Sequence, residues 1–213
     1  MTPHQIQSSI KDFELVEKRR KQIIKASIRL FKEKGFHKTT TREIAKESGF
    51  SIGTLYEYVR TKEDVLFLVY GAIYHKVHER LETTIDYKHP SIENLIAVIE
   101  SYFRLIDDMQ EEVVIMYQEM KSLQETTKTY VLEKERELVG MLKQLIRTCH
   151  PTGMTEEDAE LIANNIFVQG QMWGFRRWAL HKQFTLEEYT ASQVHYLMRA
   201  LSIEQVDSSS FFK

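Results

Sequence analysis

Four segments of this chain fit the pattern of a threonine helix cap followed three positions later by an acidic residue. At this spacing the threonine hydroxyl accepts a hydrogen bond from an early backbone N–H of a helix, and the carboxylate is favoured at the positive end of the helix dipole. The four pairs are Thr40 with Glu43, Thr61 with Asp64, Thr155 with Asp158, and Thr185 with Glu188. They predict four helix starts spread along the chain.

The distribution of proline also favours long helices. The 213 residues include three prolines, Pro3, Pro90 and Pro151, and none of them falls inside an apolar helical pattern. Because proline inside a helix removes a backbone hydrogen bond and clashes with the preceding turn, its absence allows uninterrupted helices. Alternating apolar and polar runs joined by turn pairs such as Asn-Gly, which would indicate strands, are also missing. We therefore expect an all-α fold.

Apolar periodicity places the expected helices. In the first, Ile23, Ser27 and Phe31 repeat at helical spacing and share one face, and Gly35 supplies the left-handed residue that ends it. Gly49 ends the second helix in the same way, and Ser51 caps the third. The expected helices cover about 17–34, 41–48, 52–59, 62–84, 92–108, 111–121, 126–149, 156–181 and 186–203.

Charge is distributed unevenly along the chain. Residues 1–60 contain 13 Lys and Arg against 7 Asp and Glu, a net charge of +6, whereas the remaining residues contain 16 against 24, a net charge of −8. A basic head on an acidic body favours contact between the head and a polyanion. Charge alone leaves open the alternative of an ordinary solvated surface.

Several classes of protein are not supported by the sequence. No segment approaches the roughly 18 consecutive apolar residues of a membrane span, and the N-terminus lacks the apolar core of a secretory signal, so we expect a cytoplasmic protein with no membrane partner. Cys149 is the single cysteine, which leaves no partner for a disulfide within the chain. Since no metal-ligand cluster, Gly-rich phosphate loop or nucleophile motif is found, we expect no metal, no cofactor and no enzymatic activity.

Two short helices that follow a longer one, with Gly49 between them, match a helix-turn-helix. The second short helix must present small or polar residues to the major groove at its N-terminus, and Ser51, Ile52, Gly53 and Thr54 do so. Gly53 allows a close approach of backbone to the duplex, and Thr54 reaches base edges or phosphate.

Three further residues suit contacts with the DNA backbone. The hydroxyls of Tyr56 and Tyr58 can donate to phosphate. Lys62 lies in the first turn of the next helix, where a cation is unfavourable unless an anion such as phosphate lies beside it. Core packing is the alternative role for Tyr56.

The segments GFHKTTTREIA at 35–45, SGFSIGTLYEYV at 48–59 and TKED at 61–64 closely resemble the DNA-binding domain of TetR-family regulators. Phe50 and Val59 depart from the usual Val and Phe but keep apolar residues at these positions. The resemblance implies an N-terminal three-helix helix-turn-helix domain followed by a C-terminal helical bundle for ligand binding and dimerisation, and we place the boundary between residues 1–62 and 63–213. It also implies that Thr40, Thr41, Tyr56 and Lys62 hold phosphates, and that the groove is lined by Arg42, Ser51, Ile52, Gly53, Thr54 and Tyr58.

A dimer is expected because two half-sites one turn apart require twofold symmetry. Two glycines four residues apart form a flat strip near the end of the chain, and their cost inside a helix calls for a packing reason. Packing within one chain is the alternative for each residue. The residues expected at the dimer interface are Phe167, Gly170, Gly174, Trp178, Tyr189 and Tyr196.

Adaptable apolar side chains suit an elongated lipophilic pocket in the body, although plain core packing is the alternative. The segments MWGFRRWAL at 172–180 and FTLEEY at 184–189 more weakly resemble the end of TetR-family members that respond to acyl-CoA thioesters. This resemblance implies that basic residues meet CoA phosphates, though surface ion pairs remain open. The expected ligand residues are Phe103, Arg104, Met116, Tyr117, Met120, Trp173, Arg176 and Arg177; for a lipophilic cation, Glu119 or Glu100 would serve instead.

The function expected from these features is that of a repressor that binds a palindromic DNA operator as a homodimer and is released by a small lipophilic effector such as an acyl-CoA. Ligand binding is expected to shift the fourth helix, which is shared by both domains, and to move the two heads apart. A regulator without a small-molecule ligand, an activator, and an enzyme acting on CoA esters are the alternatives.

Overall fold

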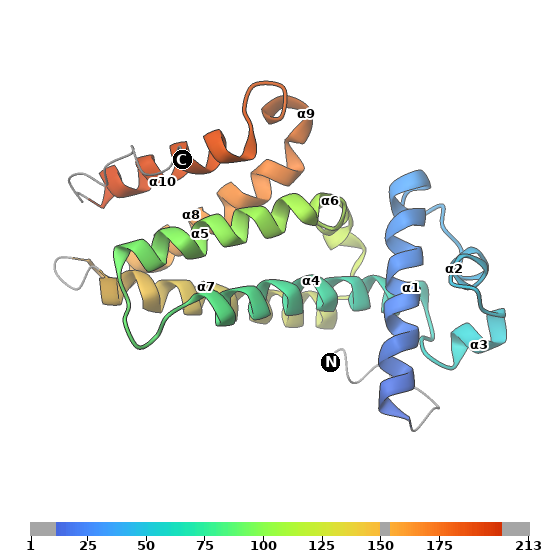
Figure 1. Ribbon diagram of the computed structural model, residues 1–213. Coiled ribbons are helices and arrows are strands. Elements are labelled where there is room, and N and C mark those ends of the chain that lie inside the picture. Colours follow the sequence, from blue (N-terminus) through green and yellow to red (C-terminus); the bar gives the residue numbers. More distant parts are fainter. Residues whose placement is uncertain (1–11, 150–153, 202–213) are drawn as a thin grey trace. The chain divides into compact units, whose positions relative to one another are not determined.

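The computed structural model describes residues 12–149 and 154–201, and within these ranges the secondary structure is helical, without strands (Figure 1). The expected end of the last helix at 203 and most of the N-terminal arm lie outside the described residues. The helices are α1 (Phe13–Lys34), α2 (Thr41–Glu47), α3 (Ile52–Tyr56), α4 (Lys62–Thr84), α5 (Ile92–Asp108), α6 (Gln110–Glu119), the 3-10 helix η2 (Met120–Ser122), α7 (Glu125–Cys149), α8 (Glu156–Phe175), α9 (Arg177–Leu180) and α10 (Leu186–Ala200).

All four predicted helix starts are confirmed. Thr40, Thr155 and Thr185 each form a reciprocal capping box with the acid three residues later. At α4 the Asp64 N–H donates to Thr61 Oγ1 at 3.0 Å, and the Thr61 N–H donates to Asp64 Oδ2 at 3.1 Å. These exchanges satisfy backbone N–H groups that have no partner inside the helix.

The glycine stops are confirmed as well. Gly35 and Gly49 have φ of 82° and 77°, in the left-handed region where a Cβ is disfavoured. Both lie where the chain must leave one helix and turn toward the next.

Other helix boundaries differ from the prediction. Helix α1 begins four residues earlier than expected, at Phe13, because Asp12 Oδ1 caps it by accepting from the Leu15 N–H at 3.0 Å. The helix expected over 156–181 is broken at Arg176, whose φ of −102° and ψ of 23° are not helical, and resumes as the short α9. The expected third helix ends at Tyr56, and the sixth ends in the 3-10 turn η2.

The chain divides into two compact units. Among the described residues, the first unit holds 12–76 with 111–136, and the second holds 77–110 with 137–149 and 154–201. The first unit therefore contains α1, α2 and α3, but also η2 and most of α6, which come from much later in the sequence. This grouping differs from the expected boundary after residue 62.

The core of the first unit forms where α1 packs against α2 and α2 packs against α3. Ile23, Phe31, Ile44 and Leu55 point into it and are buried. Burial of these apolar side chains fixes the short helices α2 and α3 in this unit. Figure 1 shows both short helices on one side of the longer α1.

In the second unit α5 packs against α8 and α10. The crossing of α5 and α8 is close at Gly170, where an added Cβ would lie 2.5 Å from Tyr102 Cε1 and 3.0 Å from Phe103 Cδ1. Among the described residues, none of the helices is both long enough and apolar enough to span a bilayer.

Candidate functional site

The turn between α2 and α3 is fixed by backbone hydrogen bonds. The Gly49 N–H donates to the Lys46 carbonyl at 3.1 Å, and the Phe50 N–H donates to the Ala45 carbonyl at 2.8 Å. Together with the buried Leu55, these bonds hold α3 in one orientation on α2. The geometry is that of a helix-turn-helix, in which the second helix presents its outer face to a ligand.

The start of α3 presents small and polar groups outward. Ser51 Oγ caps the helix by accepting from the Thr54 N–H at 3.0 Å and lies 2.9 Å from Thr54 Oγ1. Gly53 is exposed, and a Cβ added there would meet only Ser51 Oγ at 3.6 Å, an ordinary contact. The packing of this chain therefore does not require glycine at position 53, and the free space lies on the outer face of α3.

Polar side chains link α2 to α3 beside this face. Tyr56 is 50% exposed, and its hydroxyl lies 3.3 Å from Thr41 Oγ1. Arg42 is exposed on α2. Exposed hydroxyls and a guanidinium at this edge can donate hydrogen bonds to phosphate oxygens.

Glu43 stabilises the start of α2 through contacts with Lys34 and Thr40. Lys34 forms an ion pair with its carboxylate, and the Thr40 hydroxyl and backbone N–H donate to it at 2.7 and 2.9 Å. These contacts, that of Lys34 first, lower the pKa of Glu43 to about 2. Thr40 thus has a structural role as a cap, besides any contact with phosphate.

Tyr58 does not line the outer face, contrary to the prediction. It is 3% exposed, its ring centroid lies 6.3 Å from that of Phe50, and its carbonyl accepts from Arg20 Nη2 at 3.5 Å. The Arg20 side chain is buried beside it, and this desolvation lowers the pKa of the guanidinium. The chain turns after Tyr56, so that Tyr58 points into the unit instead of continuing the exposed side of α3.

Lys62 has partners that the sequence did not indicate. Its ammonium donates to the carbonyls of Phe36 and His37 at 2.9 and 3.2 Å and lies 4.3 Å from the centre of the Phe36 ring. Because the two carbonyl oxygens accept hydrogen bonds from the ammonium, the cation is stabilised at the start of α4 without a bound anion. Since an ammonium has three N–H donors, one remains for a phosphate.

The residues expected at a dimer interface fall into two groups. Phe167, Gly170, Gly174 and Tyr189 are buried within the single chain, so their prediction as interface residues is wrong. These residues pack within the chain instead. The ring centroid of Phe167 lies 4.9 Å from that of Tyr102, and the Tyr189 hydroxyl donates to the Gln169 carbonyl at 2.8 Å. Trp178 and Tyr196, by contrast, are 67% and 62% exposed.

The residues expected to bind a ligand are also divided. Met116, Tyr117 and Met120 lie in α6 and η2 of the first unit, whereas the other five lie in the second unit. Within the second unit, Phe103 is fully buried against its own chain and Arg104 is exposed. Phe103 is therefore packed in the core, and its contact with a ligand stays a prediction.

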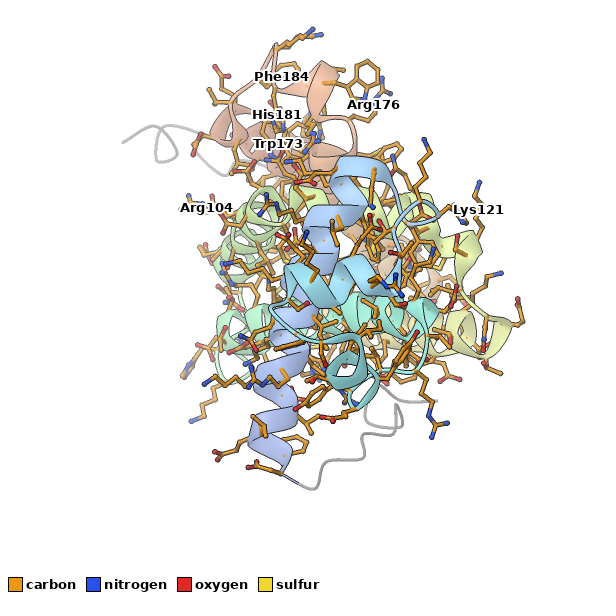
Figure 2. All side chains as sticks on the ribbon, turned by 90° about the vertical axis from the view of Figure 1, so that its right-hand side faces the viewer. Arg104, Lys121, Trp173, Arg176, His181 and Phe184 are labelled. Carbon is orange, nitrogen blue, oxygen red and sulfur yellow. The ribbon has the colours of Figure 1, made fainter. Side chains whose placement is uncertain are left out.

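Trp173 is buried in a stack of rings. His181 lies over it with a centroid distance of 4.0 Å and an interplanar angle of 29°, and Tyr189 lies at 5.1 Å. Trp173 Nε1 donates to Asp107 Oδ1 at 2.7 Å, which satisfies the indole N–H. Figure 2 shows Trp173 and His181 beside each other, with Arg176 and Phe184 labelled nearby.

An open hollow of about 50 Å³ lies between α5 and α10 of the second unit. It is lined by Glu100, Arg104, Leu186, Glu187, Thr190 and Ala191. Pockets for drug-sized ligands have volumes of about 300–1,000 Å³, so this hollow is too small for a CoA ester. Among the described residues, no group of three or more His, Cys, Asp and Glu side chains is placed to hold a metal ion.

Comparison with protein families matches two parts of the chain. Residues 23–69 match the model of bacterial regulatory proteins of the tetR family, and residues 88–178 match a tetracyclin repressor-like C-terminal domain. Among curated proteins, the HTH-type transcriptional regulator HbdR of Aromatoleum sp. (strain CIB) is 30% identical over 185 residues, which cover 86% of this chain and 81% of that protein.

Solved structures share the fold. A bacterial regulatory protein in the tetR family from Rhodococcus RHA1 is 22% identical, with a TM-score of 0.76 over 86% of this chain and 97% of that one. AibR, solved in complex with isovaleryl coenzyme A and operator DNA, is 21% identical, with a TM-score of 0.69 over 84% of this chain and 97% of that one.

Proposed function

Because the chain belongs to the TetR family of bacterial DNA-binding transcriptional regulators, we propose that it is a repressor that binds a palindromic operator as a homodimer and is released by an acyl-CoA. In this proposal residues 1–62 carry the DNA contacts, and residues 63–213 carry the dimer contacts and the effector site.

The observation that carries the proposal is the outer face of α3. Leu55 anchors the helix from inside, while Gly53 is exposed, with space in front of it, and Thr54 is partly exposed. A short helix with small residues on its free side fits the major groove, where Thr54 reaches base edges. The proposed DNA contacts are Thr40, Thr41, Arg42, Ser51, Ile52, Gly53, Thr54, Tyr56 and Lys62.

The dimer is supported by a different surface from the one expected. Leu161, Val168 and Phe175 recur every seven residues on α8 and are 62%, 47% and 38% exposed. Apolar residues at this spacing share one helix face, and such a stripe on the surface suits contact with the same stripe of a second copy. Trp178 and Tyr196, two of the residues expected at the interface, are also exposed on the second unit.

The acyl-CoA effector is supported by likeness and by chemistry. AibR, with the same fold, was solved with isovaleryl coenzyme A. Arg104 and Arg176 are exposed on the second unit and can pair with phosphate groups. An effector must bind the operator-free state more tightly than the operator-bound state in order to release the DNA.

The proposal is tested by selecting duplexes from a randomised library with the purified protein and measuring their affinity by fluorescence anisotropy. Footprints on the selected duplex should cover two half-sites about one helical turn apart. Isovaleryl-CoA or palmitoyl-CoA should release the duplex and be recovered unhydrolysed, whereas free CoA should not release it. Failure to enrich any duplex would contradict the DNA-binding part of the proposal.

A second candidate is a regulator without a small-molecule effector. It is favoured by the filled interior of the second unit, where Phe103 and Trp173 are buried among other side chains. Operator binding that no CoA ester weakens, with no molecule found on the protein by native mass spectrometry, would favour this candidate.

A further inference from the structure

Helix α6 and η2 belong to the same compact unit as the helix-turn-helix. Near the start of α6, Glu111 forms an ion pair with Lys32 of α1 at 2.7 Å. At its end, Glu119 and Ser122 meet His37, which lies in the turn between α1 and α2. Both ends of this helical segment are therefore attached to the C-terminal end of α1 or the turn that follows it.

Three side chains form the contact at the end of α6. His37 Nε2 lies 3.6 Å from Glu119 Oε2 and 3.3 Å from Ser122 Oγ. The Ser122 hydroxyl donates to Glu119 Oε2 at 3.0 Å. The side chain of Glu119 is 13% exposed and that of His37 is 70% exposed, so the carboxylate is held in place while the imidazole remains open to solvent.

The turn that carries His37 is fixed on its other side. Phe36 is buried with its ring 5.3 Å from that of Phe31, and the Thr39 hydroxyl donates to the Gly35 carbonyl at 2.9 Å. Lys62 holds the carbonyls of Phe36 and His37 from the start of α4. These contacts fix the conformation of the turn, which is followed directly by Thr40, the N-cap of α2.

We propose that His37, Glu119 and Ser122 form a positioning clip, through which α6 and η2 hold this turn and thereby the helix-turn-helix in the geometry that binds the operator. The inference rests on the proposed DNA-binding function. It assigns a role in operator affinity to residues of α6 and η2, which carry none of the proposed DNA contacts.

Charged side chains also contact the turn that carries His37 or its neighbouring residues. The charged group that meets the turn from α4 is Lys62, whose ammonium lies 3.2 Å from the His37 carbonyl. On neighbouring residues, Lys32 is paired with Glu111 and Lys34 with Glu43.

The test measures the affinity of the full-length protein for the duplex that the wild type selects. The variants are His37→Gln, Glu119→Gln and the double variant. Ser122→Ala removes the contacts of the serine hydroxyl and leaves His37 and Glu119 unchanged. Glu125→Gln is the matched control, since it removes one carboxylate of an exposed pair with Lys128 in the same unit.

Partly exposed polar contacts are worth a few-fold in an equilibrium constant, so each single variant should bind about two- to fivefold more weakly than the wild type. The double variant should bind no more weakly than either single variant, because both single changes break the same contact. Ser122→Ala should show a smaller loss, the control none, and the thermal midpoints should stay together.

Unchanged or tighter binding by both single variants, or additive losses in the double variant, would overturn the clip while leaving the proposed function intact. A wild type that selects no duplex would instead overturn the proposed function, and the clip with it.

Discussion

Replacing Gly170 by alanine tests how closely α5 and α8 approach each other. The added Cβ would lie 2.5 Å from Tyr102 Cε1 and 3.0 Å from Phe103 Cδ1, well inside van der Waals contact. Neither ring is free to withdraw, since Phe103 is fully buried and the Tyr102 hydroxyl donates to the Phe167 carbonyl at 3.2 Å. The strain must therefore be taken up by movement of the helices or of packed rings.

Two opposing effects determine how far Gly170→Ala changes the free energy of unfolding. Alanine gains about 1 kcal/mol over glycine inside a helix, whereas overpacking a core costs about 1–3 kcal/mol. Because the contact at Gly170 is so short, we expect the upper end of that cost and a net loss of about 2 kcal/mol in the free energy of unfolding. For a chain of this size the thermal midpoint should fall by about 4–8 °C.

Gly140→Ala is the matched control. Gly140 lies inside α7, in the same unit, and a Cβ there would meet nothing within 4 Å. This variant should gain about 1 kcal/mol and melt about 2–4 °C higher. Differential scanning calorimetry of the two variants beside the wild type provides the comparison. If Gly170→Ala is as stable as Gly140→Ala, the close crossing is refuted.

Three further predictions concern other surfaces. Contacts with Lys34 and Thr40 lower the pKa of Glu43 to about 2 in the folded chain, so its ionised form stabilises the fold fully above about pH 4.3, the ordinary glutamate pKa. This contribution is lost as the pH falls toward 2, and the Glu43→Gln variant should not show that loss of stability in acid unfolding. Identical pH profiles of stability for the variant and the wild type would contradict the prediction. Lys62→Met should weaken binding to every duplex and reduce the slope of log affinity against log salt by about 0.9, one phosphate; an unchanged slope in anisotropy titrations would restrict Lys62 to its carbonyl contacts. Leu161→Glu should convert the proposed dimer to a monomer in analytical ultracentrifugation with the helical circular dichroism unchanged, and a persisting dimer would rule out the α8 stripe.

Local chemistry made much of the fold predictable from sequence. The threonine caps, such as Thr61 with Asp64, and the stops at Gly35 and Gly49 depend on residues a few positions apart, so spacing alone locates them. The inward positions of Ile44 and Leu55 follow from helical periodicity for the same reason.

Packing partners were not predictable in this way. Periodicity shows that Gly170 and Tyr189 lie on apolar faces, but it does not tell whether such a face meets the same chain or a second copy. Tyr58 was placed on the exposed side by extending α3 beyond its actual end at Tyr56. The contact of His37 with Ser122 joins residues 85 positions apart, and no local pattern pairs them.

The central claim, that α3 enters the major groove, is tested most directly by the operator affinity of Gly53→Ala. A methyl group at position 53 meets only Ser51 Oγ, at 3.6 Å, so the free protein accommodates it and its thermal midpoint should not fall. In the complex the same methyl group would occupy the space between α3 and the duplex, and the affinity should fall at least about tenfold, equivalent to about 1.4 kcal/mol. Undiminished affinity of a folded Gly53→Ala variant would mean that the duplex does not approach this face of α3.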